Sequence, residues 1–162
     1  MPTLHLLRHA KSDRSAPVAD HERPLNARGR RAAPRIGRLL ADTGGPDVVL
    51  TSSAVRARDT AELVAEMLSD TVTVRSEPAL YLADDETLRA RLAALDPAVD
   101  AALLVAHNPG IGDLAVRLAD PADRRRITSF PTAALATLEV PAWATLTDGC
   151  ARLTSFVVPR DL

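Results

Sequence analysis

The chain has 162 residues, of which 46% are hydrophobic and 25% charged, and its formal net charge is −1. These values are typical of a globular protein long enough to bury a core. The net charge is too small to attract nucleic acid or an anionic membrane, so binding through overall charge is excluded. Aromatic residues make up only 2% of the chain, which disfavours a surface that stacks on bases.

The sequence also carries expectations about location. Cys150 is the single cysteine, so no intrachain disulfide can form and a reducing compartment is expected. The first apolar run is too short for a secretory signal and is followed by charge, and no apolar stretch approaches the ~20 residues that a membrane helix needs. We therefore expect a single domain over residues 1–162, located in the cytoplasm.

The chain begins with a short apolar segment that ends abruptly in polar residues. Leu4–Leu7 has the length of a buried strand and is too short for a buried helix, and Arg8 and His9 follow it directly. In open α/β sheets, ligands bind at the carboxyl ends of the strands. We therefore expect Arg8 and His9 to lie at such an edge.

The first expected helix follows a polar loop and runs from Ala27 to about Asp42. Asn26 is placed to cap it and Gly44-Gly45 to end it. Pro34 is a misfit that should kink the helix or mark a ragged first turn. One face of this helix carries four arginines, Arg28, Arg31, Arg35 and Arg38. This face could bind an anionic partner, although nearby acidic residues and the nearly neutral net charge of the chain favour a solvated surface.

The next strand and helix carry an arginine of particular interest. Asp47–Thr51 is expected as a strand, and Ser52-Ser53 as the cap of a helix from about Ala54 to Ser69. Arg56 lies on the apolar side of this helix, in its first turn. A buried arginine needs an anion, which could be a neighbouring carboxylate or a ligand at the edge of the sheet.

The following segments lead to a second histidine at a strand end. Thr71–Arg75 alternates as a strand does, and acids open a helix from Asp84-Asp85 to about Leu95. Ala101–Ala106 is the most continuous apolar segment, and it ends in His107 just before a helix over about Ile111–Leu118.

This alternation of strands and helices predicts a three-layer α/β/α sandwich with a mostly parallel sheet. Two late strands, Ala133–Val140 and Arg152–Val158, are expected to form an antiparallel edge. His9, Arg56 and His107 all follow strand ends, so we expect them to meet at the carboxyl edge of the sheet.

A site with two arginines and two histidines is suited to a phosphoryl group. Arginines are planar, permanently charged donors that match phosphate oxygens bidentately. Histidine supplies a nucleophile and acid–base capacity near neutral pH. No carboxylate cluster with metal-ligand spacing accompanies them, so we expect neither a metal nor a cofactor. These residue types predict that one histidine attacks phosphorus while Arg8 and Arg56 neutralise its oxygens.

Four segments in register resemble the histidine phosphatase superfamily, which has the phosphoglycerate mutase-like fold. Leu7-Arg8-His9-Ala10 is similar to its Arg-His-Gly signature, with alanine in place of the usual glycine. Ser53–Ala61 is similar to its Ser-x-x-x-Arg-Ala-x-x-Thr-Ala segment, with one residue fewer between the serine and the arginine, and Val105–Asn108 is similar to the segment with its second histidine. Pro24–Gly29 resembles the segment that opens its first helix. At this length the chain most resembles the small SixA-type branch of phosphohistidine phosphatases.

The resemblance implies a metal-independent phosphatase that forms a phosphohistidine intermediate on His9. It also implies that Arg8 and Arg56 bind the phosphoryl oxygens and that His107 donates to the phosphoryl group in the transition state. The expected partner is a phosphorylated protein or a small phosphorylated substrate, with no role for nucleic acid or membrane, and the oligomeric state stays open. Three further residues are expected to line the phosphate pocket: Lys11, Ser12 and Asn108.

Larger branches of this superfamily carry an acidic general acid after the third strand, and this chain has no clear equivalent. Asp84 and Asp85 are the candidates in that region. An alkoxide leaving group needs a proton, whereas imidazole leaves readily once solvent has protonated it, so such a site favours phosphoramidates or other activated phosphates. The short chain also lacks the insertions that enclose small metabolites, so we expect an open, shallow pocket.

Two alternatives stay open at this point: a small-molecule phosphomonoesterase on the same site, and a non-catalytic phosphate-binding regulatory module. A metal hydrolase that uses His9 and His107 is disfavoured, because the motifs offer no carboxylate ligand. Four other polar residues are expected to be structural, one in the core and three in the loop before the first helix: His5, Asp20, His21 and Arg23.

Overall fold

A six-stranded mixed sheet forms the centre of the fold in the computed structural model, which describes all of residues 1–162. The strands lie in the order β3-β2-β4-β1-β5-β6. β1 to β4 are parallel to their neighbours, whereas β5 runs antiparallel to both β1 and β6. The bounds are Thr3–Arg8 (β1), Val48–Ser52 (β2), Thr73–Glu77 (β3), Ala101–Ala106 (β4), Leu135–Glu139 (β5) and Arg152–Val157 (β6).

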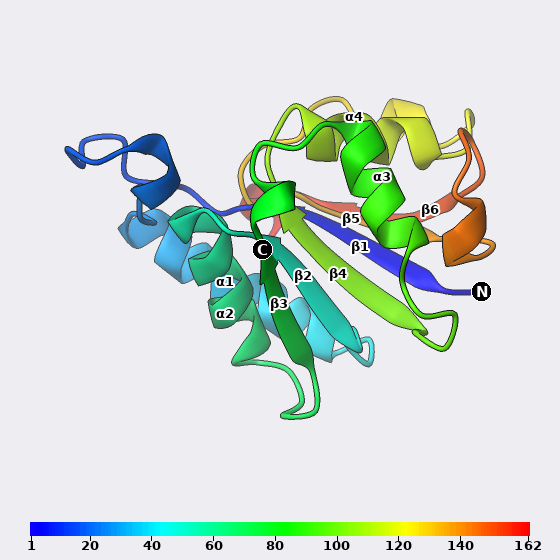
Figure 1. Cartoon of the computed structure of the whole chain (residues 1–162), viewed down its shortest axis with the longest axis horizontal. Coiled ribbons are helices and arrows are strands. Elements are labelled where there is room, and N and C mark those ends of the chain that lie inside the picture. Colours follow the sequence, from blue (N-terminus) through cyan, green and yellow to red (C-terminus); the bar gives the residue numbers. More distant parts are fainter.

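Four α-helices cover the two faces of this sheet, so the prediction of a three-layer sandwich with a late antiparallel edge is confirmed. α1 and α2 pack together on one face, and α3 and α4 pack together on the other (Figure 1). No helix combines the length and the apolar character that crossing a membrane requires. The helices are Ala27–Ala41 (α1), Val55–Ala65 (α2), Asp85–Ala93 (α3) and Gly110–Leu118 (α4).

Successive side chains of the central strands enter two separate apolar clusters. Leu4 and Leu6 of β1 join the cluster under α3 and α4, while Leu7 joins the one under α1 and α2. In β4, Leu104 joins the cluster under α3 and α4, and Leu103 joins the one under α1 and α2. A parallel sheet covered on both faces needs apolar residues at consecutive positions, which explains why these strands are continuous apolar runs in the sequence.

Several predicted boundaries differ from the observed ones. β3 begins and ends two residues later than Thr71–Arg75, and its residues up to Ser76 are exposed, so no buried face fixed its register in the sequence. α2 ends at Ala65 rather than Ser69. α1 continues through Pro34 in its middle, so the predicted ragged first turn is wrong. Asn26 does cap α1, because its side chain accepts a hydrogen bond from the Gly29 N–H at 2.9 Å.

The sheet order places three strand ends side by side. β2, β4 and β1 are parallel neighbours, so their carboxyl ends meet at one edge. Arg8 pairs with Ala106 in register, so His9 and His107 leave the sheet next to each other. The chain after β1 then extends beyond α1 and α2 before it returns as α1 (Figure 1). The predicted meeting of site residues at this edge thus follows from strand register.

Candidate active site

A cavity of about 370 Å³ opens at this edge of the sheet. It brings together the four residues predicted to act on phosphate, which are Arg8, His9, Arg56 and His107, and the three predicted to line the pocket, which are Lys11, Ser12 and Asn108. Two further basic residues, Arg14 and Arg23, also line the cavity, whereas Asp20 is its only acidic residue. This excess of positive charge is suited to an anion.

His9 is a buried imidazole whose tautomer the neighbouring backbone fixes. Its Nδ1 lies 2.8 Å from the carbonyl oxygen of Ala10. A carbonyl oxygen can only accept a hydrogen bond, so Nδ1 carries the proton and Nε2 carries the lone pair. Burial lowers the pKa of His9 to about 3, with the positive charges of Arg56 and Arg8 adding to the effect, so the ring is neutral at pH 7. Nε2 is therefore free to act as a nucleophile.

His107 lies beside His9, with the ring centroids 5.2 Å apart, and has the opposite tautomer. Its Nδ1 is 3.4 Å from Nη2 of Arg56, which can only donate, so Nδ1 accepts. The proton is therefore on Nε2, which donates to the Ser52 hydroxyl at 2.7 Å. Burial, reinforced by the charge of Arg56, lowers the pKa of His107 to about 4. An anion beside Nδ1 would offset this effect and favour the protonated ring.

The two arginines each have a hydrogen-bond donor that the protein leaves unpaired. Arg8 donates from Nη1 to the Phe130 carbonyl at 3.2 Å, and its buried Nε has no partner. Arg56, which is only 2% exposed, also has a buried Nε without a partner. Leaving a buried donor unsatisfied costs about 1–3 kcal/mol, and more for a charged group. An anion that accepts hydrogen bonds from Arg8 and Arg56 would remove this cost.

Asp20 holds Arg56 in place from the loop before α1. Arg56 donates from Nη1 to the Asp20 carbonyl at 2.7 Å and from Nη2 to its carboxylate at 3.1 Å. The same carboxylate accepts a hydrogen bond from the Tyr81 hydroxyl and one from Arg23 at 3.0 Å. The bond from Tyr81 is the largest of the effects that hold the pKa of Asp20 well below its usual range. Asp20 is therefore a fixed negative charge that orients Arg56.

Thr60 links the nucleophile loop to α2. Its buried hydroxyl donates to the Arg56 carbonyl at 2.7 Å and accepts from the Ala10 N–H at 3.0 Å. The backbone that follows His9 and the backbone of Arg56 are thus tied to a single side chain. This contact explains why a threonine stands four residues after the arginine in the motif.

Gly29 allows α1 to pack against the same loop. A Cβ at this position would lie 2.2 Å from the Lys11 carbonyl oxygen, a distance that no side chain can accept. The Asn26 N–H also donates to that oxygen at 3.0 Å, and Ser12 forms an isolated bridge with Leu25. The start of α1 therefore fixes the backbone that follows His9.

Neither candidate for the general acid lies in the cavity. Asp84 caps α3, where its carboxylate accepts a hydrogen bond from the Thr87 N–H at 2.9 Å. Asp85 pairs with Arg117 at 3.2 Å, on the side of the fold covered by α3 and α4. In the segment that leads from β3 to α3, only Leu82 lines the cavity, and its side chain is apolar. The structure also contains no group of three or more histidine, cysteine or acidic side chains positioned to hold a metal ion.

Comparisons with known proteins place this geometry in a family. The model of the histidine phosphatase superfamily (branch 1) matches residues 4–81. The uncharacterized protein Rv1276c of Mycobacterium tuberculosis is 39% identical over 162 aligned residues, which cover 95% of this chain and 100% of that protein. The structure of the proposed phosphohistidine phosphatase SixA from Nakamurella multipartitia is 31% identical, with a TM-score of 0.85 over 98% of this chain and 96% of that one.

The chain belongs to the histidine phosphatase superfamily. Its likeness to the SixA-type branch rests on a second structure as well, the proposed phosphohistidine phosphatase SixA from Agrobacterium tumefaciens. This structure is 30% identical, with a TM-score of 0.84 over 98% of this chain and 99% of that one. The family recognised from four short motifs in the sequence is therefore confirmed over nearly the whole chain.

Sequence reasoning missed three side chains that contact the main site residues, and a fourth, His21, that contacts one of these three. Ser52 was expected to cap α2, and its hydroxyl does accept a hydrogen bond from the Ala54 N–H at 3.2 Å, but it also accepts one from His107. The His21 ring contacts the Tyr81 ring and bonds to the Ser53 hydroxyl at 2.8 Å. Only the position of Ser52 at the end of a strand could have indicated its contact. The four residues whose role in the site the sequence did not indicate are Asp20, His21, Ser52 and Tyr81.

The buried histidines of this histidine phosphatase predict a loss of stability in mild acid. Burial lowers the pKa of His5 and His107 to about 4 and that of His9 to about 3, from an ordinary value of 6.5. The unfolded chain binds protons at these rings below pH 6.5, whereas the folded chain does not until the lower pKa is reached. Stability is therefore complete above pH 6.5 and is lost progressively as the pH falls toward 4.

Urea denaturation at a series of pH values in phosphate-free buffer measures this effect. We expect the free energy of unfolding to fall by up to about 1.4 kcal/mol per pH unit for each of these histidines. In the double variant His9→Gln/His107→Gln, His5 is the only one of the three buried histidines left, and the slope should drop to roughly one third. A free energy of unfolding that does not change from pH 6.5 to pH 4.5 would show that the three rings are not buried as neutral groups.

Proposed function

We propose that this protein is a metal-independent phosphatase that removes the phosphoryl group from phosphohistidine on another protein, through a phosphohistidine intermediate on its own His9. One observation carries the proposal: a neutral His9, whose Nε2 carries the lone pair, lines the same cavity as Arg8 and Arg56. The names of the two SixA proteins that share about 30% of its sequence support the choice of substrate.

In the first step, Nε2 of His9 attacks phosphorus, and the bond from phosphorus to the leaving nitrogen breaks. The electron pair of that bond leaves with the imidazole of the substrate, which takes its proton from solvent. His9 becomes positively charged, and the hydrogen bond from its Nδ1–H to the Ala10 carbonyl both stabilises this charge and holds the ring in line. The ring therefore needs no proton transfer before it attacks.

The arginines and His107 bind the phosphoryl oxygens during this step. Arg8 and Arg56, which both line the cavity, donate hydrogen bonds to these oxygens, and their charge offsets that of the transferred group. The dianion raises the pKa of His107, so its Nδ1 takes up a proton from solvent, gives up the bond from Arg56 and donates a hydrogen bond to a phosphoryl oxygen. In the second step, water attacks phosphorus, the bond to Nε2 breaks and its electron pair returns to His9, and inorganic phosphate leaves after the protons of the water pass to it or to solvent.

The pocket favours a leaving group that needs no acid from the protein. The Asp20 carboxylate stays ionised, and Asp84 and Asp85 lie outside the cavity. An alkoxide would leave only with a donated proton, which is worth about 10²- to 10⁴-fold in rate. Imidazole leaves without that help once solvent protonates it, and this difference supports phosphohistidine over an alkyl phosphate.

The substrate preference is testable with matched peptides. We expect kcat/KM for a phosphohistidine peptide to exceed that for the same peptide with phosphoserine by at least about 100-fold, because only the second needs a general acid. Initial rates of phosphate release, measured with and without a chelator, provide the comparison and test independence from metal. Rapid turnover of the phosphoserine peptide that is lost in Asp84→Asn or Asp85→Asn would show that an acid operates and would contradict the preference.

We also propose that residues 1–162 act as one domain in a reducing compartment such as the cytoplasm. All the proposed catalytic residues come from one edge of one sheet, so no second folded unit is needed to complete the site. Cys150 is the only cysteine and is free and half-buried, so the fold does not depend on an oxidising environment.

A further inference from the structure

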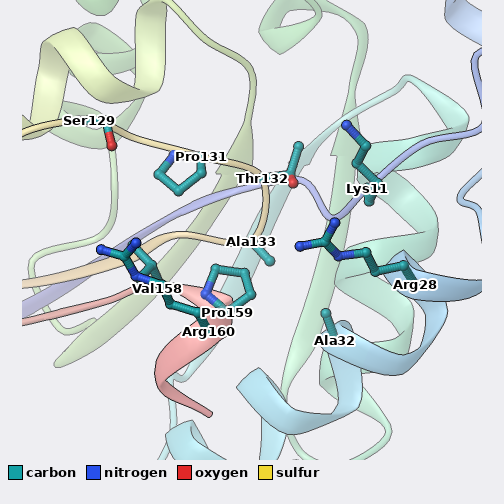
Figure 2. Close-up of a pocket in the computed structure, with 10 residues that line it drawn as sticks. All are labelled: Lys11, Arg28, Ala32, Ser129, Pro131, Thr132, Ala133, Val158, Pro159 and Arg160. Atoms are coloured by element: carbon teal, nitrogen blue, oxygen red, sulfur yellow. The ribbon is translucent and has the colours of Figure 1, made fainter.

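Two further cavities continue from the catalytic one along the surface. The first, of about 310 Å³, shares Lys11, Pro131 and Thr132 with the catalytic cavity (Figure 2). The second, of about 200 Å³, shares Arg28, Pro159 and Arg160 with the first. Together they form an elongated surface, here named the basic groove, with five cationic side chains: Lys11, Arg28, Arg31, Arg35 and Arg160.

The five cations of the basic groove have no acidic partner within ion-pair distance. No aspartate or glutamate lines either cavity. The neighbouring Asp161 carboxylate accepts a hydrogen bond from the Val158 N–H at 3.2 Å. Seven arginines elsewhere do have acidic partners: Arg23, Arg56, Arg89, Arg91, Arg117, Arg126 and Arg152.

Three separate segments of the chain supply this charge. In Figure 2, Lys11 and Arg28 lie on one side of the first cavity and Arg160 on the opposite side, with the Pro159 ring and Ala133 between them. Lys11 follows β1, Arg28 is in the first turn of α1, and Arg160 belongs to the short 3-10 turn Pro159–Asp161. The arginine face of α1 is exposed, as expected, but part of it is also one wall of a groove.

We propose that the basic groove binds an acidic segment of the phosphorylated protein while its phosphohistidine occupies the catalytic cavity. This inference rests on the proposed function, since it names the surface that the protein substrate presents. The apolar floor suits the carbon atoms of a polypeptide, and the cations at the rim suit its carboxylates. A series of three connected cavities is longer than one small phosphate ester requires.

Nucleic acid is a weaker match for the same groove. Only 2% of the residues are aromatic, and no aromatic side chain lines either groove cavity, so bases have nothing to stack on. The net charge of the chain is −1, which provides no long-range attraction for a polyanion of high charge density. Acidic side chains on a protein surface need only the local charge of the groove.

Fluorescence anisotropy with a fluorescein-labelled oligoglutamate peptide tests the groove without any need for turnover. We expect the double variant Arg28→Glu/Arg160→Glu to bind the peptide at least about tenfold more weakly than the unaltered protein, because attraction becomes like-charge repulsion. Folding should be preserved, since glutamate in the first turn of α1 interacts favourably with the helix dipole. Arg38→Glu is the matched control, because Arg38 is exposed on α1, has no ion pair and lines neither cavity.

Each outcome of this measurement decides the inference. Equal binding by the unaltered protein and the double variant, or equal loss in Arg38→Glu, would overturn it. Tighter binding of a labelled single-stranded oligonucleotide than of oligoglutamate, with the same dependence on Arg28 and Arg160, would overturn the acidic protein segment as the occupant. Loss confined to the double variant, with oligoglutamate bound more tightly than the oligonucleotide, supports it.

A kinetic comparison separates this inference from the proposed function. Two phosphohistidine peptides, one with flanking glutamates and one with flanking glutamines, are compared on both proteins. The ratio of their kcat/KM values should favour glutamate by about tenfold in the unaltered protein and should fall to near unity in the double variant. If neither peptide is hydrolysed by the unaltered protein, the proposed function fails, while the oligoglutamate measurement still decides the groove.

Discussion

Replacing His9 with alanine should lower kcat for any phosphorylated substrate by at least about 10³-fold, because the variant has no nitrogen that can form the covalent intermediate. Steady-state phosphate release from p-nitrophenyl phosphate measures this loss. Phosphate affinity should largely remain, since Arg8 and Arg56 keep their unpaired donors. The loss would thus be in the chemical step rather than in binding.

His5 provides the control for this substitution. It is also a buried histidine of β1 with a lowered pKa, but its Nδ1 bonds to the Thr137 hydroxyl at 2.9 Å and it does not line the catalytic cavity. His5→Asn should therefore reduce stability and leave kcat within about threefold. If His9→Ala kept a tenth or more of the activity, the nucleophile would be another group.

Replacing Arg56 with lysine should lower kcat by about 10²- to 10³-fold although the charge is kept. The guanidinium makes two bonds to Asp20 while it also lines the catalytic cavity, and one ammonium group cannot reproduce this planar arrangement. The same assay of p-nitrophenyl phosphate hydrolysis, together with the inhibition constant for inorganic phosphate, measures the effect.

Arg58 is the matched control for Arg56. It lies on the same helix but is exposed and forms no ion pair, so Arg58→Lys should change kcat by less than about twofold. A substitution of Arg56 by lysine that left kcat and phosphate affinity at their original values would mean that this guanidinium does not contact the transferred group.

The sequence predicted the sheet edge well because the pattern of the central strands depends on burial alone. β1, β2 and β4 are covered on both faces, so each had to be a short apolar run, and their ends marked His9 and His107 directly. β3 has one neighbour and exposed side chains, so its pattern left the position of the strand uncertain by two residues. Where packing determines the residue types, the sequence identifies the element.

The parts of the site that the sequence did not predict come mainly from loops. Asp20 and Tyr81 are 61 positions apart, and their hydrogen bond depends on the paths of two irregular segments that no periodicity describes. Neither residue type is unusual in a loop, so nothing in the sequence distinguished Asp20 from a solvated acid. The sequence showed the arginine face of α1 but not the groove beside it, because Arg160 approaches Arg28 only in the folded chain.

The most direct test of the central claim is a rapid-quench experiment with a substrate that carries a radioactive phosphoryl group. The reaction is stopped in base after a few milliseconds, and mass spectrometry locates the label on the protein. The proposed mechanism predicts a burst of phosphate bound to His9 that is stable in base, labile in acid and absent from the His9→Ala variant. Turnover with no bound phosphate, or with acid-stable phosphate on another residue, would contradict it.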